Sequence, residues 1–163
     1  MIPKRAIYKP PFVKFLDQRL LPNKIFYVKT KNARQTAKAI KDMVLRGAPL
    51  IGCAAAYGYA IDLRFQKPRS WNKLLKQTKG AADILKKSRP TALALFYAVD
   101  RLHKKTLSFI NERKTRPFDL KFYERRFIYR SFGNHNHIAL QRGSETVRQE
   151  QRETVRQRSL LAP

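Results

Sequence analysis

The first part of the chain alternates between short apolar runs and turn-forming residues. Residues 12–17 (FVKFLD) and 24–29 (KIFYVK) are rich in aromatic and β-branched side chains, and the segment LLPN between them contains turn formers. Runs of this composition are typical of strands. The pattern therefore predicts two short strands that pair as an antiparallel β-element.

A helical period follows the second predicted strand. The segment NARQTAKAIKDMVLRG begins with Asn32, a residue type favoured at the N-cap of a helix. The helical period places four apolar residues on one face: Ala37, Ile40, Met43 and Val44. Gly47 and Pro49 are expected to end this helix.

Three further helices are predicted downstream. Residues 50–65 consist largely of small side chains, which allow neighbouring backbones to approach closely and predict a buried helix. Ser70 is expected to cap a third helix that ends in the basic pair at 86–87. A fourth helix is expected from residue 91 or 92 to about residue 110, with four core-facing residues: Leu93, Phe96, Val99 and Leu102. The predicted fold class is therefore mainly α, a short N-terminal antiparallel β-element followed by a helical bundle.

The composition adds a large positive charge to this picture. The 163 residues include 36 Lys plus Arg and 11 Asp plus Glu, a formal net charge of +25. Such a charge suggests nucleic acid, an anionic surface or a phosphorylated ligand as the partner. The lysines are spread over three of the four predicted helices and no nucleic-acid-binding module is recognisable. No specific nucleic acid is therefore expected as a partner.

Cysteine content and hydropathy exclude several other classes of protein. Cys53 is the one cysteine of the sequence, which excludes an intramolecular disulfide and a cysteine-built zinc site. The first 15 residues contain three prolines and lack the apolar core of a signal peptide. No apolar run approaches the roughly 20 residues of a membrane-spanning helix. We therefore expect a cytoplasmic chain with no membrane partner.

The source of the positive charge changes near residue 112. Residues 1–112 contain 16 Lys and 8 Arg, whereas residues 113–163 contain 2 Lys and 10 Arg. The sequence ETVRQ occurs twice in this second part, within polar, low-complexity sequence that buries too little apolar surface to order itself. We expect a domain over 1–112 and a disordered or irregular tail over 113–163. Three origins of the tail stay open: a genuine basic appendage, a linker into a lost domain, or translation in a shifted frame.

Two arginines stand shortly before predicted helices. Arg46 directly precedes Gly47, and Arg89 lies in the bend KKSRPTA. A guanidinium beside the unpaired N–H groups of a helix start suits an anion, and a phosphorylated small molecule is the natural ligand class. On spacing alone, a second interpretation stays open for each arginine: it caps the carbonyls of a helix end, or it is simply solvated.

Three segments have the order and the intervals of segments in a known enzyme family. They are LDQRLLP (16–22), AIKDMVLRGAPLIGCAAAYGYAI (39–61) and SRPTALALFYAVDRL (88–102). With them, residues 12–105 resemble the methylthioribose-1-phosphate isomerases, which belong to the family of the alpha, beta and delta subunits of translation initiation factor 2B.

The resemblance implies a sugar-phosphate ligand and an isomerase reaction. Members of the family contact the phosphorylated sugar with an Arg-Gly-Ala segment and the arginine of a Ser-Arg-Pro segment. These residues correspond to Arg46, Gly47, Ala48 and Arg89. The implied activity is the aldose–ketose isomerisation of methylthioribose 1-phosphate to methylthioribulose 1-phosphate in methionine salvage, without a cofactor. A homodimer is also expected from the resemblance.

The chain departs from the family pattern inside the matched region. Ala94 stands where the family usually has Asn, and Tyr97 stands where it usually has Trp, so an amide near the ligand is replaced. Cys53 occupies a position that is usually valine, which indicates a core-packing role. His135 and His137 have no third ligand in a recognisable pattern, so no metal site is expected.

The catalytic residues of the family lie in a Rossmann-like second domain. They are a cysteine in a Thr-His-Cys-Asn-Ala-Gly segment and an aspartate, and neither segment occurs in this sequence. The resemblance fades at about Leu107, close to the change from lysine to arginine. A single-base slip would produce both effects, so we expect an N-terminal part of the isomerase with an aberrant tail and little or no activity alone. The alternative is a non-catalytic regulatory relative of the initiation factor subunits.

Overall fold

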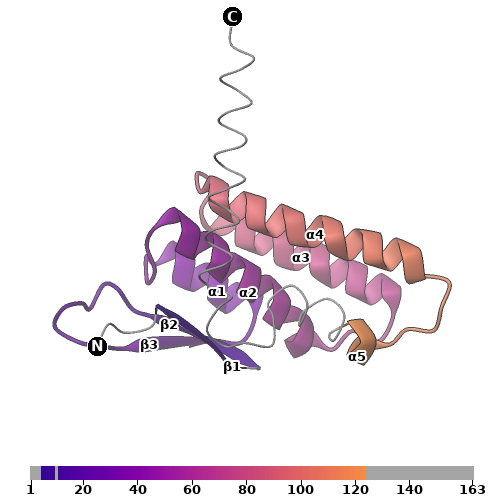
Figure 1. The fold of residues 1–163 in the computed structure, drawn as a ribbon, viewed down its shortest axis with the longest axis horizontal. Helices are drawn as coiled ribbons and strands as arrows, with labels where there is room; N and C mark the ends of the chain where they lie inside the picture. Colours follow the sequence, from indigo (N-terminus) through magenta and orange to yellow (C-terminus); the bar gives the residue numbers. More distant parts are fainter. Residues whose placement is uncertain (1–4, 10, 124–163) are drawn as a thin grey trace, which may run out of the picture.

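The computed structural model describes residues 5–9 and 11–123 of the chain. In this part, a three-stranded antiparallel sheet precedes five helices (Figure 1). The strands are β1 (Ala6–Lys9), β2 (Phe12–Leu16) and β3 (Tyr27–Thr30), and the helices are α1 (Ala33–Lys41), α2 (Ala48–Gln66), α3 (Trp71–Ser88), α4 (Leu93–Arg113) and α5 (Leu120–Tyr123). The predicted fold class is confirmed over this range. Most of the predicted tail lies outside the described residues.

The sheet contains the two predicted strands and one that was not predicted. Strands β2 and β3 pair antiparallel, with Val13 opposite Thr30. Strand β1 pairs with the other edge of β2, with Ala6 opposite Phe15. Val13 and Phe15 are fully buried, as expected for alternate residues that face the core side of a sheet. The residues of β1 lie in a short segment between prolines and show no strand pattern of their own. Backbone pairing with β2 therefore determines that this segment is a strand.

The end of α1 differs from the sequence prediction. The helix ends at residue 41, and Met43 adopts a left-handed conformation with φ of 59°. The N–H of Met43 donates to the carbonyl of Ile40 at 3.2 Å, and the N–H of Val44 donates to the carbonyl of Ala39 at 3.1 Å. These two bonds form a Schellman motif, which reverses the chain. The prediction that Met43 and Val44 continue the helical face of Ala37 and Ile40 is therefore wrong: both lie beyond the helix, where Met43 is exposed and Val44 is buried.

Helix α2 is the central helix of the domain and is buried, as predicted. It packs against α1, α3 and α4 and against strand β2. Pro49 lies in its first turn, where the missing N–H has no partner to lose, and so begins this helix instead of ending the previous one. A Cβ on Gly52 would lie 2.8 Å from the carbonyl oxygen of Ala94, and one on Gly58 would lie 2.7 Å from the Cβ of Thr36. Glycine is thus what lets α4 and α1 approach α2 so closely.

Helices α2 and α4 lie side by side and run in the same direction. Gly52 near the start of α2 meets Ala94 near the start of α4. Further along, the hydroxyl of Tyr59 donates to the hydroxyl oxygen of Thr106 at 3.2 Å. The second contact lies further from the N-terminus than the first on both helices, so the N-termini of α2 and α4 lie at the same end of the bundle.

Helix α4 begins close to the predicted position but with a different first residue in the core. Val99 and Leu102 are buried as predicted, and Phe96 is half-buried. Leu93, by contrast, is 81% exposed. As the first helical residue it precedes the packing against α2, which begins at Ala94. The prediction that Leu93 faces the core is wrong.

None of the helices in residues 5–9 and 11–123 combines the length and the apolar character needed to cross a membrane.

Candidate functional site

The connection between α1 and α2, residues 42–47, is the centre of the candidate site. Two residues that follow strand β2 hold this connection in place. The N–H of Gln18 donates to the carbonyl of Val44 at 2.8 Å, and Nη1 of Arg19 donates to the carbonyl of Asp42 at 3.2 Å. The position of the connection is therefore set by the sheet and not by α1 alone.

Arg19 is oriented by a buried carboxylate. Asp17 is 2% exposed, and its two oxygens accept hydrogen bonds from Nε of Arg19 at 2.8 Å and from Nη2 of Arg19 at 2.6 Å. The hydrogen bond from Arg19 lowers the pKa of the Asp17 carboxyl below its usual value. Two parallel bonds fix the plane of the guanidinium, which leaves Nη1 directed at the end of α1.

Neither Asp17 nor Arg19 was predicted from the sequence to have a role in the site. The available signal was an aspartate and an arginine two residues apart at the end of a predicted strand. That spacing gives a local ion pair, which is usually weak on a surface. The burial of Asp17 and the bond to Asp42 across 23 residues make the pair structural, and neither is visible in the local sequence.

The start of α2 presents unpaired backbone donors beside Arg46. Arg46 is exposed and lies directly before Gly47, whose φ of 91° disfavours any residue with a side chain. Gly47 has no side-chain oxygen to cap the helix, and its carbonyl accepts the N–H of Ile51 at 3.0 Å. The N–H groups of Ala48 and Leu50, which belong to the first turn, therefore point ahead of the helix.

The start of α4 has the same character beside Arg89. A turn with Pro90 at its second position is closed by a hydrogen bond from the N–H of Ala92 to the carbonyl of Arg89 at 3.1 Å. Ala92 is the N-cap residue of α4 and has no side-chain oxygen. Arg89 is half-buried, and its Nη1 lies 3.1 Å from the sulfur of Met43.

The structure thus brings the predicted site residues to one end of the bundle. Arg89 reaches the α1–α2 connection three residues before Arg46, through its contact with Met43. The contact between Gly52 and Ala94 holds the two helix starts next to each other. The positive ends of two helix dipoles and two guanidinium groups then lie in one region, an arrangement that attracts an anion.

Other candidate chemistry is weaker. Cys53 is half-buried within α2, and burial raises the pKa of its thiol, which is the opposite of what a reactive thiolate requires. No group of three potential metal ligands occurs among residues 5–9 and 11–123. His135 and His137 lie outside the described residues.

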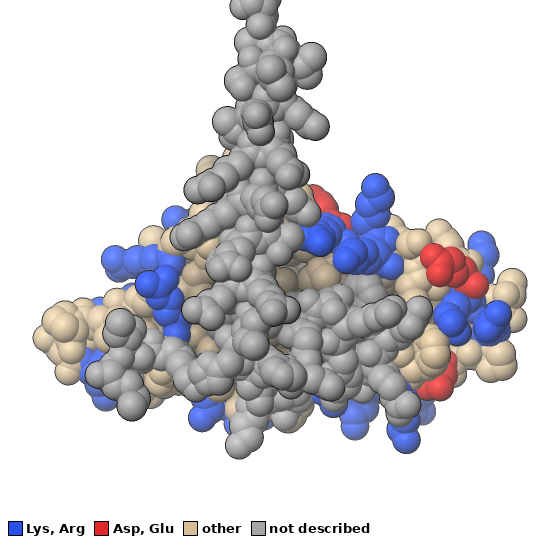
Figure 2. All heavy atoms as spheres, viewed as in Figure 1, with Lys and Arg blue, Asp and Glu red and all other residues tan. Residues whose placement is uncertain are grey.

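The basic side chains visible in Figure 2 are distributed around the rim of the molecule and do not form a single patch on this face. The Lys and Arg side chains coloured in this view therefore come from several elements. The candidate site is therefore identified by its two helix starts and not by the overall charge of the chain.

Comparison with known proteins relates this arrangement to one family. The model of the initiation factor 2 subunit family matches residues 44–154. Methylthioribose-1-phosphate isomerase 2 of Pseudothermotoga lettingae is 47% identical over 89 residues, which are 55% of this chain and 25% of that protein.

Two solved structures share the fold. The 5-methylthioribose 1-phosphate isomerase of Pyrococcus horikoshii OT3 superposes with a TM-score of 0.66 and 31% identity, over 91% of this chain and 36% of that one. The delta subunit of translation initiation factor eIF-2B from A. fulgidus superposes with a TM-score of 0.65 and 27% identity, over 91% and 37% of the two chains. The chain spans 25 to 30% of the length of the first curated relatives it matches.

Proposed function

Because the chain belongs to the initiation factor 2 subunit family, we propose that it binds the phosphate of methylthioribose 1-phosphate, as the N-terminal part of a methylthioribose-1-phosphate isomerase. The observation that supports this most directly is the pair of adjacent helix starts without side-chain caps, each preceded by an arginine. A phosphate monoester has the charge and the acceptor oxygens that such an arrangement lacks.

Four residues have defined roles in this proposal. Arg46 and Arg89 pair with the phosphate oxygens, and the N–H groups of Gly47 and Ala48 donate to the same group from the start of α2. Gly47 is required because its φ of 91° turns the backbone donors toward the ligand without a side chain in the way. Arginine suits this position better than lysine, since its planar fork can bind two phosphate oxygens at once.

Exposed apolar side chains beside the arginines supply a second element of recognition. Met43 contacts Arg89, and Leu93 at the start of α4 is 81% exposed. Tyr97 lies one helical turn further along the same face of α4 and is also exposed. We propose that these residues contact the apolar methylthio end of the ligand, because burying it there removes apolar surface from water.

The reaction is an aldose–ketose isomerisation, in which a proton leaves one sugar carbon and returns to its neighbour. This requires a positioned acid and base next to the two carbons. The four proposed residues hold the phosphate and are not suited to move a carbon-bound proton at neutral pH, since guanidinium and amide groups keep their protons. We therefore expect the 163-residue chain to bind the sugar phosphate with little or no turnover alone.

Calorimetric titration with methylthioribose 1-phosphate tests the binding proposal. Arg46→Gln and Arg89→Gln are each expected to weaken binding about tenfold or more, the effect of losing one charge-assisted hydrogen bond. Arg116→Gln is the matched control, because Arg116 is exposed beyond the opposite end of α4. Equal weakening by all three substitutions would show nonspecific charge attraction and overturn the proposal.

Two further ligands separate the elements of recognition. Methylthioribose without the phosphate should not bind detectably if the arginines and helix starts hold the phosphate. Ribose 1-phosphate should bind more weakly than the methylthio compound, and Leu93→Gln should remove this difference. An unchanged preference in Leu93→Gln would contradict the role of the apolar side chains.

A regulatory protein of the same family is the second candidate. It is supported by the superposition on the eIF-2B delta subunit, which is nearly as close as that on the isomerase. The titration distinguishes the two: a chain that acts only through protein contacts would show no saturable binding of the sugar phosphate.

A further inference from the structure

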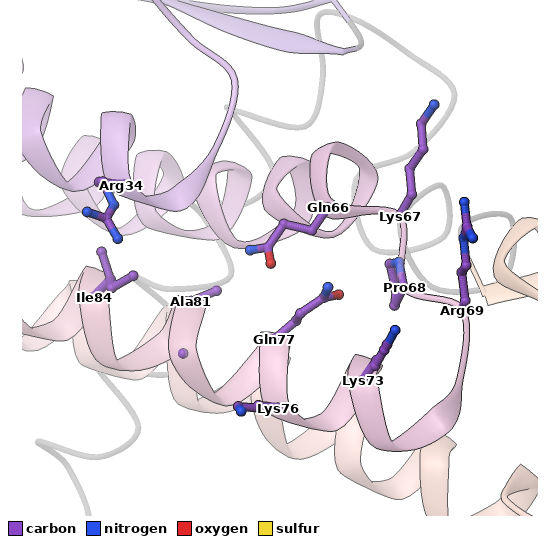
Figure 3. Close-up of a pocket in the computed structure, with 11 residues that line it drawn as sticks. Arg34, Gln66, Lys67, Pro68, Arg69, Lys73, Lys76, Gln77, Ala81 and Ile84 are labelled. Carbon is purple, nitrogen blue, oxygen red and sulfur yellow. The ribbon is translucent and has the colours of Figure 1, made fainter.

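A concave surface lies at the far end of α2 from Arg46. It has a volume of about 660 Å³ and is bounded by the last turn of α2, the α2–α3 connection and the first half of α3 (Figure 3). Helix α2 has 19 residues, which corresponds to about 28 Å at a rise of about 1.5 Å per residue. This surface is therefore separate from the candidate site described above.

Five basic side chains line this surface, which we call the basic groove: Arg34, Lys67, Arg69, Lys73 and Lys76. No aspartate or glutamate is among the residues that line it. Within the described part of the chain, no carboxylate lies within ion-pair distance of any of the five. The groove therefore concentrates positive charge that the surrounding residues do not neutralise.

The carboxylate of Asp62, on α2 behind the groove, is used elsewhere. Asp62 is buried and accepts hydrogen bonds from the N–H of Ala33 at 2.8 Å and from the side-chain amide of Gln66. The first bond ties α2 to the start of α1, and the second lies within α2. Arg34 is the groove cation that interacts electrostatically with Asp62, and among the described residues no ion pair joins this carboxylate to the other four. Burial raises the pKa of the Asp62 carboxyl, and its hydrogen bonds and the charge of Arg34 oppose this shift.

The start of α3 adds a second electrostatic argument. Its first turn contains no acidic residue, and Arg69 and Lys73 lie on either side of its N-cap, Ser70. Cations at the positive end of a helix are unfavourable, whereas an anion there is favourable. A bound anion would therefore offset both the repulsion among the side chains and their repulsion by the helix.

One polar group in the groove also lacks a partner. The side-chain oxygen of Gln77 is buried and accepts no hydrogen bond from any described residue. Gln66 and Gln77 point from α2 and α3 into the space between the two helices, whereas the Lys67 side chain extends away from it (Figure 3). Buried amide oxygens are normally satisfied, so a ligand with a hydroxyl or amino donor would complete this position.

We propose that the basic groove binds the oligophosphate group of a small molecule. Five cations exceed what a single phosphate needs, and the groove has the size of sites that enclose small organic ligands. A nucleic acid strand fits less well, because no aromatic side chain that could stack on a base is among the lining residues. Inorganic tripolyphosphate carries the proposed chemistry without any organic part and is therefore the probe.

Calorimetric titration of the full chain with tripolyphosphate at constant ionic strength tests the proposal. Arg69→Gln and Lys73→Gln should each weaken binding about tenfold. Lys104→Gln and Lys105→Gln remove the same charge from the exposed face of α4 and should change the affinity less than about twofold. Tripolyphosphate can also bind at the sugar-phosphate site, so the titration is repeated with methylthioribose 1-phosphate present in saturating amount. The binding that then remains should still be weakened by Arg69→Gln and Lys73→Gln, which separates the two sites.

Two outcomes would overturn the proposal. One is an equal loss of affinity in the groove variants and in the α4 controls, which would show that net charge alone attracts the probe. The other is tighter binding of a single-stranded oligonucleotide than of tripolyphosphate, with the same sensitivity to Arg69→Gln and Lys73→Gln. Melting curves recorded without ligand verify that every variant is folded before its affinity is compared.

Discussion

Helices α1 and α3 begin with a side-chain cap, whereas α2 and α4 begin without one. The side-chain oxygen of Asn32 accepts the N–H of Gln35 at 2.8 Å, and that of Ser70 accepts the N–H of Lys73 at 3.3 Å. Gly47 and Ala92 have no oxygen to offer. Of the four long helices, two therefore have a start that a side chain caps, and two have a start without such a cap.

The difference separates parts of the chain that build the scaffold from parts that are available to a ligand. A capped start has satisfied part of its own hydrogen-bonding requirement and gains about 1 kcal/mol from it. An open start keeps its donors for another molecule, and at α2 and α4 an arginine accompanies each. In the basic groove, by contrast, α3 is already capped, so the proposed anion is held there by side chains.

Gly52→Ala is expected to have the largest effect, because it separates the two open starts. The new methyl group would lie 2.8 Å from the backbone oxygen of Ala94, which cannot move without displacing α4. We expect a loss of about 2–3 kcal/mol in the free energy of unfolding, measured by denaturant titration, together with weaker binding of methylthioribose 1-phosphate. Gly80→Ala is the control: its Cβ meets open space in α3 and should stabilise by about 0.5–1 kcal/mol. Equal stability of the two variants would contradict the tight contact between α2 and α4.

Asp17→Asn loosens the connection that leads into α2. It replaces a buried carboxylate that accepts hydrogen bonds from Arg19, and we expect a loss of about 1–3 kcal/mol at neutral pH. The pKa of Asp17 is lowered in the folded chain, so this stabilisation is present above the ordinary carboxyl pKa and is lost as the pH falls through the folded value. Wild type and variant should therefore converge in stability on acidification. A difference that stays constant down to acidic pH would exclude the ionised pair as its source.

Ala92→Asp converts an open start into a capped one. The carboxylate would accept N–H groups of the first turn of α4 and place a negative charge where the phosphate is proposed to bind. We expect about tenfold weaker binding of methylthioribose 1-phosphate, with no loss of stability. Ala92→Ser provides a cap without the charge and should weaken binding less. Unchanged affinity in both variants would show that the donors of α4 do not contact the ligand.

Asn32→Ala and Ser70→Ala open the capped starts and give the smallest expected effect. Each substitution removes one hydrogen bond to the first turn and should lower the free energy of unfolding by about 1 kcal/mol. Binding of methylthioribose 1-phosphate should stay within about twofold of wild type, because neither cap is near the two arginines. A larger change in affinity would show that the capped starts of α1 and α3 also contribute to ligand binding, against the proposed difference between capped and open starts.

Local pattern was sufficient where a residue's own neighbours decide the structure. Strands β2 and β3, the capping residues Asn32 and Ser70, and the buried character of α2 all follow from side-chain period and from cap chemistry. The positions of Arg46 and Arg89 shortly before helices were also predicted, whereas their role in binding an anion stays a prediction. These features need no knowledge of distant contacts.

Local pattern failed where distant backbone groups decide the structure. The apolar period of α1 continues through Met43, yet the chain turns at this residue. The turn is held by hydrogen bonds from Gln18 and Arg19, which follow strand β2, to backbone carbonyls of the α1–α2 connection. Strand β1 forms because β2 offers an edge, and its own residues give little signal. Arg19 had no predicted role for the same reason, since its partner carbonyl lies 23 residues away.

The glycines of α2 also determine which substitutions this domain can accept. Gly52 faces α4 and Gly58 faces α1, so the absence of a side chain at each position sets how closely α2 packs against these two helices. In a saturation mutagenesis library, these two positions should reject almost every replacement, including alanine, while Gly80 accepts many. Tolerance would then follow the available volume at each glycine and not its distance from the ligand.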